Sequence, residues 1–150
     1  MSVGKHLCVL LLLSAILGAS EAKQLAVIVD KTNNVSSMTA VDLTKMFKFD
    51  SHKWPDGRNV VVVLRDPTSP EMQAAMQKLY HMQPEEFKAL LAAHSTAVVI
   101  VHSEEDLLRS VQSIPGAVGL VDVYSINSRV NVLKVDGKLP LEQGYFLKGN

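Results

Sequence analysis

The residues best suited to chemistry in this sequence are Arg65, Thr68 and Ser69, which lie in one short polar segment after an apolar run. A guanidinium is a fixed positive fork that matches the oxygens of a phosphate or carboxylate, and hydroxyl groups supply further donors. The segment leads into Pro70, where a helix is expected to begin, and the free N–H groups of a helix start attract anions. This combination predicts an oxyanion-binding loop with Arg65, Ser69 and Thr68 as ligands.

The same segment also fits a purely structural role. Thr68 and Glu71 have the spacing of a capping box, in which side chains satisfy the first N–H groups of a helix. The carboxylate of Glu71 would then occupy the place of the anion, and Pro70 would remove one donor. Arg65 would pair with Asp66 or Glu71. The residues of this segment leave both interpretations open.

Other candidate sites in the sequence are weaker. Met72, Met76 and Met82, together with His81, raise the alternative of a copper site, because thioether sulfurs suit Cu(I). Met72 and Met76 share the apolar stripe of a helix, however, and His81 would lie on its opposite side, so packing in the core is the expected role. The remaining histidines lack ligand spacing, and no nucleophile or dinucleotide-binding motif is present. We expect no metal, no cofactor and no enzymatic activity.

Export from the cytoplasm is predicted by the N-terminal segment. An apolar run covers residues 7–17, and Ser20 and Ala22 are the small residues that a signal peptidase requires. The run is short for a permanent membrane span, although an N-terminal anchor is the alternative. Residues 1–22 are therefore expected to be a signal peptide that directs the protein to the periplasm. Residues 23–150 are expected to form a single domain with no stable membrane span in the mature form.

Composition limits the classes of function. The chain has 150 residues, a formal net charge of +0 and 47% hydrophobic residues, which suffices for one domain with its own core. The balanced charge shows no basic surplus, so nucleic acid is not expected as a partner. Cys8, the only cysteine, lies in the predicted signal peptide. The mature domain would therefore contain no disulfide and no thiol nucleophile.

Strands and helices alternate along the rest of the chain. Apolar, β-branched runs predict strands at 23–30, 60–64, 97–101, 117–121 and 130–135. Helical periodicity predicts helices that begin after Thr39, at Pro70, at Pro84 and after Ser103, and the pairs Thr39–Asp42 and Ser103–Asp106 resemble capping boxes. This pattern predicts an α/β fold, a mostly parallel sheet with helices on both faces. Ligands of such sheets bind beyond the carboxyl ends of strands, where Arg65 is placed.

Several segments resemble the second lobe of periplasmic phosphate-binding proteins, the type II substrate-binding proteins of ABC importers. The similar segments are Leu25–Val29 with Asn33 and 35–37, Leu43–Phe47, Trp54–Gly57, Arg65 with Ser69, Pro115–Gly119, and Val135–Pro140. They keep the family's order and spacing from about Leu25 to Tyr145. The resemblance implies one lobe of the family's fold and inorganic phosphate, or a similar oxyanion, as ligand.

The sequence also departs from the family pattern. Pro70 and Glu71 stand where the family has glycine and threonine, so only Arg65 and Ser69 match ligand positions. The family binds its ligand between two lobes, and this chain has room for one. A single lobe leaves the anion exposed to water, and solvent-exposed ionic contacts contribute little to the free energy of binding. We therefore expect weak or absent phosphate binding unless a homodimer or an envelope protein partner supplies the second wall.

Two functions remain open from the sequence. The first is a phosphate- or oxyanion-binding envelope protein that resembles a substrate-binding protein and is accessory to an ABC phosphate importer. The second is an interaction or structural module of the cell envelope that has kept the fold of the lobe and binds no small ligand.

Overall fold

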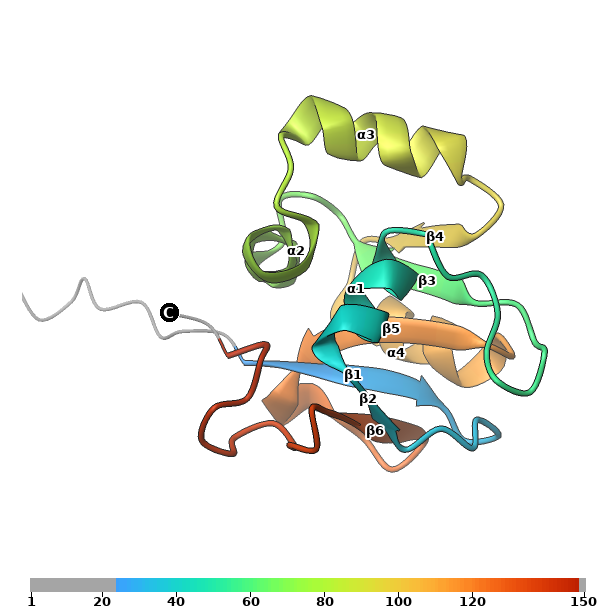
Figure 1. Cartoon of the computed structure of the whole chain (residues 1–150), viewed down its shortest axis with the longest axis vertical. Helices are drawn as coiled ribbons and strands as arrows, with labels where there is room; N and C mark the ends of the chain where they lie inside the picture. Colours follow the sequence, from blue (N-terminus) through green and yellow to red (C-terminus); the bar gives the residue numbers. More distant parts are fainter. Residues whose placement is uncertain (1–23, 149–150) are drawn as a thin grey trace, which may run out of the picture.

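A six-stranded sheet forms the centre of the protein in the computed structural model, which describes residues 24–148 (Figure 1). Its strands are β1 (Leu25–Asp30), β2 (Ser37–Met38), β3 (Val61–Arg65), β4 (Val98–Val101), β5 (Ala117–Asp122) and β6 (Val130–Val135). The helices are α1 (Ala40–Phe47), α2 (Pro70–Ala75), α3 (Pro84–Ala93) and α4 (Glu104–Ser113), with a π-helix η3 (Met76–Tyr80) and a 3-10 helix η4 (Val123–Ser125). The predicted strands and helices are present. The short strand β2 has no counterpart in the prediction.

The direction of the strands confirms a mostly parallel sheet. The strand order is β2-β6-β1-β5-β3-β4. β3 is parallel to both β4 and β5, and β2 is parallel to β6, whereas β1 is antiparallel to its two neighbours, β5 and β6. An apolar run carries no information about direction, so the sequence did not indicate that β1 runs against the others.

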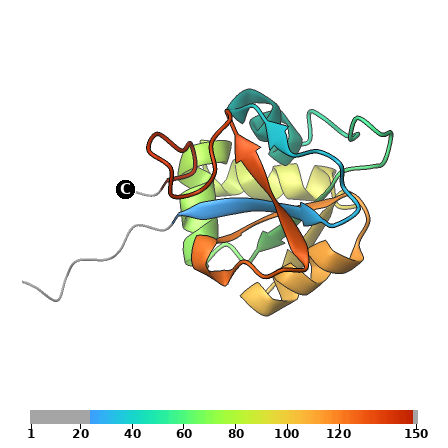
Figure 2. The same ribbon diagram turned by 90° about the horizontal axis from the view of Figure 1, so that it is seen from below.

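Helices cover both faces of the sheet, as predicted. Side chains of β1 alternate between the faces, because successive residues of a strand point to opposite sides. Leu25, Val27 and Val29 belong to the core on the side of α1, α2 and α3, and Ala26 and Ile28 belong to the core under α4. Figure 2 shows α4 on one side of the sheet and the other three helices on the opposite side.

Side-chain caps fix where three helices begin. The hydroxyls of Thr39 and Ser103 accept hydrogen bonds from the N–H groups three residues later, as predicted. At α2 the cap is Ser69, whose Oγ accepts from the N–H of Met72. The expected capping box that begins at Thr68 is therefore wrong by one residue.

The helix predicted from Pro70 to Tyr80 changes type along its length. α2 is α-helical to Ala75, and η3 continues it as a π-helix to Tyr80. A left-handed residue, His81, ends it with φ of 48°. Leu79 and Tyr80 are both fully buried in this last turn, and the ring of Tyr80 packs against Phe47 of α1 and Phe87 of α3.

The turn predicted at Trp54–Gly57 is anchored in the body of the protein. The indole Nε1 of Trp54 donates to the carbonyl of Gly116 at 2.8 Å, and the indole is buried. Gly116 has a φ of 82°, and a Cβ there would lie 2.1 Å from the carbonyl oxygen of Asn59. A glycine is therefore required where this loop meets the start of β5.

The ends of the chain lie partly beyond the described residues. The predicted signal peptide, residues 1–22, lies outside them. Among residues 24–148, no helix has the length and apolar character needed to cross a membrane.

Candidate oxyanion site

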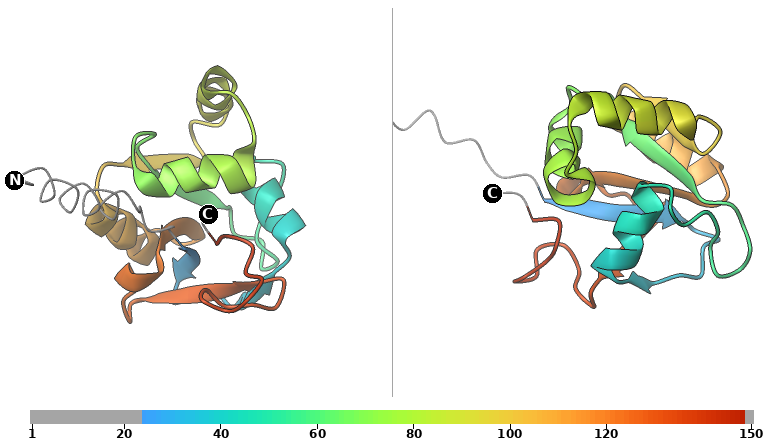
Figure 3. Two further views of the ribbon diagram at one scale, coloured as in Figure 1. Left: turned by 90° about the vertical axis from the view of Figure 1, so that its left-hand side faces the viewer. Right: turned by 45° about the horizontal axis from the view of Figure 1, so that its top comes forward.

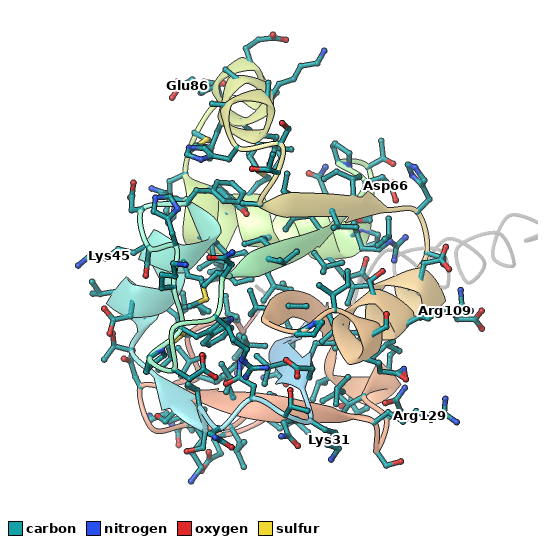
Figure 4. The ribbon with its side chains drawn as sticks, turned by 90° about the vertical axis from the view of Figure 1, so that its right-hand side faces the viewer. Lys31, Lys45, Asp66, Glu86, Arg109 and Arg129 are labelled. Atoms are coloured by element: carbon teal, nitrogen blue, oxygen red, sulfur yellow. The ribbon has the colours of Figure 1, made fainter. Side chains whose placement is uncertain are left out.

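The predicted ligands Arg65, Thr68 and Ser69 lie together between the end of β3 and the start of α2. The backbone ties this loop to the neighbouring strand, because the N–H of Asp66 donates to the carbonyl of Val101 at 3.1 Å. Figure 4 shows Asp66 at the surface beside the end of β4. The loop therefore occupies the carboxyl edge of the parallel strands β3 and β4, as the sequence predicted.

The guanidinium of Arg65 faces two carboxylates of its own loop. Its Nη1 lies 3.5 Å from Oε2 of Glu71, and its Nε lies 3.6 Å from Oδ1 of Asp66. The side chains of Arg65 and Glu71 are only 16% and 8% exposed, so their interaction is little screened by solvent. An internal carboxylate thus lies where an external oxyanion was expected to meet Arg65.

These ion pairs lack direct hydrogen bonds. The buried Nε of Arg65 and the buried Oε2 of Glu71 have no hydrogen-bond partner among the described residues. The distances of 3.5 and 3.6 Å exceed those of charge-assisted hydrogen bonds, which are about 2.7–2.9 Å. Arg65 therefore forms ion pairs with both carboxylates, but its Nε makes no hydrogen bond within the described residues.

Ser69 is committed to the helix that follows it. Its side chain is buried, and its Oγ lies 3.2 Å from the N–H of Met72, from which it accepts. Its carbonyl accepts from the N–H of Gln73 at 3.1 Å. Pro70 contributes no N–H group. Two early donors of α2 are therefore satisfied within the chain, which leaves fewer for an anion.

Thr68 is directed at Asp66. Its hydroxyl donates to Oδ2 of Asp66 at 2.6 Å. This hydrogen bond is the main cause that holds the pKa of Asp66 below its ordinary value of 3.8, and Arg65 lowers it further. Asp66 is therefore ionised at neutral pH. Arg65 therefore lies beside two carboxyl side chains of its own loop, Asp66 and Glu71.

The methionines considered for copper lie around an apolar pocket. Met72, Met76 and Met82 line it with Phe87, and its volume is about 460 Å³. His81 does not line this pocket, and Met72 is buried in the core. No group of three or more His, Cys, Asp or Glu side chains in residues 24–148 is arranged to hold a metal ion.

Comparison with known proteins places the fold. No protein-family model and no curated protein match the sequence. Among solved structures, an ABC-type phosphate transport receptor from Vibrio cholerae is 17% identical, with a TM-score of 0.72 over 85% of this chain and 54% of that chain. PstS from Borrelia burgdorferi is also 17% identical, with a TM-score of 0.71 over 85% of this chain and 55% of that chain.

A third similar structure contains a ligand. It is a protein assigned to phosphate ABC transport in Clostridium perfringens and solved with bound phosphate; it is 23% identical, with a TM-score of 0.65 over 77% of this chain and 46% of that chain. This chain therefore spans about half the length of the structures it matches. Identities this low establish the fold alone. The resemblance inferred from the sequence is confirmed at that level: the chain has the α/β fold of one lobe of phosphate-binding proteins.

Proposed function

We propose that this chain is a non-enzymatic module of the cell envelope that keeps the lobe fold of phosphate-binding proteins and works by contact with a protein partner. The observation that carries the proposal is the position of Glu71, whose carboxylate lies 3.5 Å from Arg65 in a buried setting. The guanidinium of Arg65, which would otherwise be available to an oxyanion, is paired with a carboxylate of the same chain.

Electrostatics support this assignment. A phosphate at Arg65 would lie close to the carboxylates of Asp66 and Glu71, and like charges in a poorly solvated site repel strongly. The hydroxyl hydrogen of Thr68 is already donated to Asp66, and the hydroxyl of Ser69 accepts from the N–H of Met72. An incoming anion would have to displace the ion pairs of Arg65 and the hydrogen bond from Thr68 to Asp66 before these two residues could bind it.

Calorimetric titration of phosphate and of sulfate tests the proposal. We expect no saturable heat with the unmodified chain at millimolar anion. Glu71→Gln removes the competing charge at nearly constant shape, so it should bind either anion more tightly than the unmodified chain does. The double variant Arg65→Ala, Glu71→Gln should lose that gain. Saturable binding of phosphate to the unmodified chain, abolished by Arg65→Ala alone, would overturn the proposal.

A second candidate function is oxyanion binding at Arg65, Ser69 and Thr68, in a protein accessory to an ABC phosphate importer. Two observations favour it: the likeness to a structure with bound phosphate, and the buried Nε of Arg65, which has no hydrogen-bond partner within residues 24–148. Binding to one lobe would be weak, because a millimolar dissociation constant corresponds to about 4 kcal/mol. The same titration separates the two candidates.

Both candidates place the protein in the periplasm, exported by the predicted signal peptide at residues 1–22. The similar structures support this setting, since PstS from Borrelia burgdorferi and a protein described as a phosphate transport receptor from Vibrio cholerae have the same fold. The partner would accordingly be another envelope protein, such as an importer component, or a second copy of this chain.

A further inference from the structure

An excess of positive charge lines a pocket beside α1, which we call the lysine pocket. It lies between α1, the end of η3 and the C-terminal segment 136–148, and its volume is about 440 Å³. The lining residues that bear on its function are Val41, Lys45, Lys48, Lys78 and Phe146. The left view of Figure 3 shows the green α2–η3 helix reaching α1, with the red C-terminal segment below them. None of residues 65–71 lines the lysine pocket, so it is separate from the candidate oxyanion site.

Sequence spacing puts one apolar and two basic side chains on the outer face of α1. Val41 and Lys45 are four residues apart, and the C-cap Lys48 follows three residues later, so the three are neighbours on one face. The opposite face buries Leu43 and Met46 in the core. Because Val41 is 63% exposed, the outer face offers a partner an apolar surface next to its two charges.

The three lysines of the pocket have no acidic partner within residues 24–148. No ion pair in that part of the chain involves Lys45, Lys48 or Lys78. Asp50 also lines the pocket, yet it is not paired with any of the three. The pocket therefore gathers three positive charges against one carboxyl group, in a chain whose formal net charge is +0.

The ends of two helices account for part of this charge. Lys45 lies in the last turn of α1 and Lys78 in the last turn of η3, where cations interact favourably with the helix dipole. That interaction would stabilise each helix, but it does not require the two helix ends to converge on one pocket with Phe146. A role in helix stability and a role in binding are separable, because only the second depends on a partner.

We propose that the lysine pocket binds an acidic segment of a partner protein, whose carboxylates meet the lysines while an apolar side chain rests on Val41 and Phe146. Charge complementarity selects this partner. Each lysine offers a point charge with rotatable donors, which suits the flexible carboxylates of a peptide. Arginine is the residue suited to bidentate recognition of a single phosphate, and none of the described residues that line the pocket is an arginine.

A free anion would gain little in the lysine pocket. The N–H of Ala40 already donates to Asp136, and that of Asp42 donates to the hydroxyl of Thr39, so the start of α1 does not offer these donors. A single ion would meet exposed ammonium groups that are screened by water and salt. A peptide segment would meet several of these groups at once and would also cover apolar surface.

The inference deepens the proposed function, on which it rests in taking the partner to be a protein. The two fail separately, because Arg65 and Glu71 lie outside the lysine pocket. Saturable phosphate binding that depends on Arg65 would overturn the proposed function. Peptide binding that does not depend on the three lysines would overturn only the inference made from this pocket.

Fluorescence anisotropy with a short labelled peptide tests the proposal on the full chain. The probe carries glutamates on both sides of one leucine, and the control probe carries glutamines in their place. The unmodified chain should bind the acidic probe more tightly than the control probe, and its affinity should fall as sodium chloride is added. Replacing the leucine of the probe by glycine should weaken binding severalfold and leave the salt dependence unchanged, since only apolar contact is lost.

Two triple variants with the same change in net charge locate the binding. The pocket variant is Lys45→Gln, Lys48→Gln, Lys78→Gln. The control variant changes three exposed lysines outside the pocket and is Lys31→Gln, Lys88→Gln, Lys134→Gln. The pocket variant should bind the acidic probe roughly tenfold more weakly than the unmodified chain, because three modest charge contacts are removed together. The control variant should bind nearly as well as the unmodified chain.

Three results would overturn the proposal. The first is the absence of salt-dependent binding of the acidic probe to the unmodified chain, and the second is equal affinity of the two triple variants. A lower urea midpoint for the pocket variant, with this equal affinity, would assign the lysines to the helix ends alone. The third is binding to vesicles of phosphatidylcholine and phosphatidylglycerol that requires the three lysines, without binding of the peptide, which would assign the pocket to a membrane surface.

Discussion

Within the candidate site, the structure predicts a shifted pKa for the carboxyl group of Asp66. Its pKa is lowered chiefly by the hydrogen bond from Thr68. A group whose pKa is lower in the folded state stabilises the fold above its ordinary pKa and loses this effect as pH falls through the folded value. The contribution of Asp66 is therefore complete at neutral pH and disappears only below its ordinary value of 3.8.

Thr68→Val removes the donor while it keeps the shape of the side chain. We expect the pKa of Asp66 to rise toward its ordinary value, because the ionised carboxylate loses its strongest hydrogen bond. Carboxyl carbon chemical shifts followed by NMR during an acid titration would measure this change. Thr44→Val is the control, since its hydroxyl donates to the carbonyl of Ala40 and should leave Asp66 unchanged.

Glycine at position 116 is required by both backbone conformation and space. Gly116→Ala would place a methyl group 2.1 Å from the carbonyl oxygen of Asn59, at a φ of 82°. We expect a loss of about 3 kcal/mol or more in the free energy of unfolding, measured with urea. Gly137→Ala has a similar φ of 77°, but no atom of the described residues lies within 4 Å of the new methyl group. It should cost about 1–2 kcal/mol, and equal losses would mean that the clash at Gly116 is relieved by movement of the loop.

At the scale of elements, α3 is held less firmly than α4. Its only buried residue is Phe87, whose ring lies 4.7 Å from that of Tyr80, and its first turn has no side-chain cap. α4 buries Leu107 and Val111 and is capped by Ser103. Local opening needs less free energy where few apolar contacts hold a segment.

Hydrogen exchange followed by mass spectrometry should therefore show faster exchange in α3 than in α4. Phe87→Leu, which shortens the single anchor, should accelerate exchange in α3 further and leave α4 unchanged. If α3 were protected as strongly as α4 in the unmodified chain, or if Phe87→Leu accelerated both helices alike, the two helices would belong to one cooperative unit.

Elements with strong local signals were predictable from the sequence. The caps at Thr39 and Ser103 were found because a hydroxyl three residues before an acidic residue has a clear local meaning. The π-helix after Ala75 was not, since the apolar side chains of Met76, Leu79 and Tyr80 also fit an α-helix. Strand direction and the short strand β2 depend on long-range pairing with β6, which no local pattern encodes.

The location of the candidate site was predictable from the sequence, but the hydrogen-bond and ion-pair partners of its residues were not. The end of β3 placed Arg65, Thr68 and Ser69 on one loop, as expected. The hydrogen-bond or ion-pair partner of each side chain depends on the direction of that side chain, which sequence spacing does not determine. The hydroxyl of Thr68 donates to Asp66, and the N-terminal cap of α2 is Ser69 instead. Glu71 lies close enough to Arg65 to form an ion pair. Both interpretations of the sequence therefore contained part of the observed geometry.

At the scale of the whole molecule, the C-terminal segment that follows β6, residues 136–148, runs back to lie beside the start of β1 (Figure 1). Its sequence shows no regular pattern, yet Tyr145 and Leu147 are only 3% and 1% exposed. The hydroxyl of Tyr145 donates to the carbonyl of Leu25 at 2.8 Å, and the N–H of Leu25 donates to the carbonyl of Leu147 at 3.3 Å. The first strand is thus tied to the last described residues, and this contact should report on the stability of the complete fold.

Tyr145→Phe tests this closure with the smallest possible change. The variant keeps the buried ring but leaves the carbonyl of Leu25 without its side-chain donor, so the free energy of unfolding should fall by about 1–2 kcal/mol. Urea denaturation should show a lower midpoint and an unchanged slope, since the folded state remains intact. Burial raises the pKa of Tyr145, so the hydroxyl stays protonated and the loss should be the same at neutral and mildly alkaline pH. Tyr124→Phe is the matched control, because that side chain is 84% exposed and should change stability by less than about 0.5 kcal/mol. Equal midpoints for the two variants would mean that the C-terminal segment rests on the sheet without stabilising it.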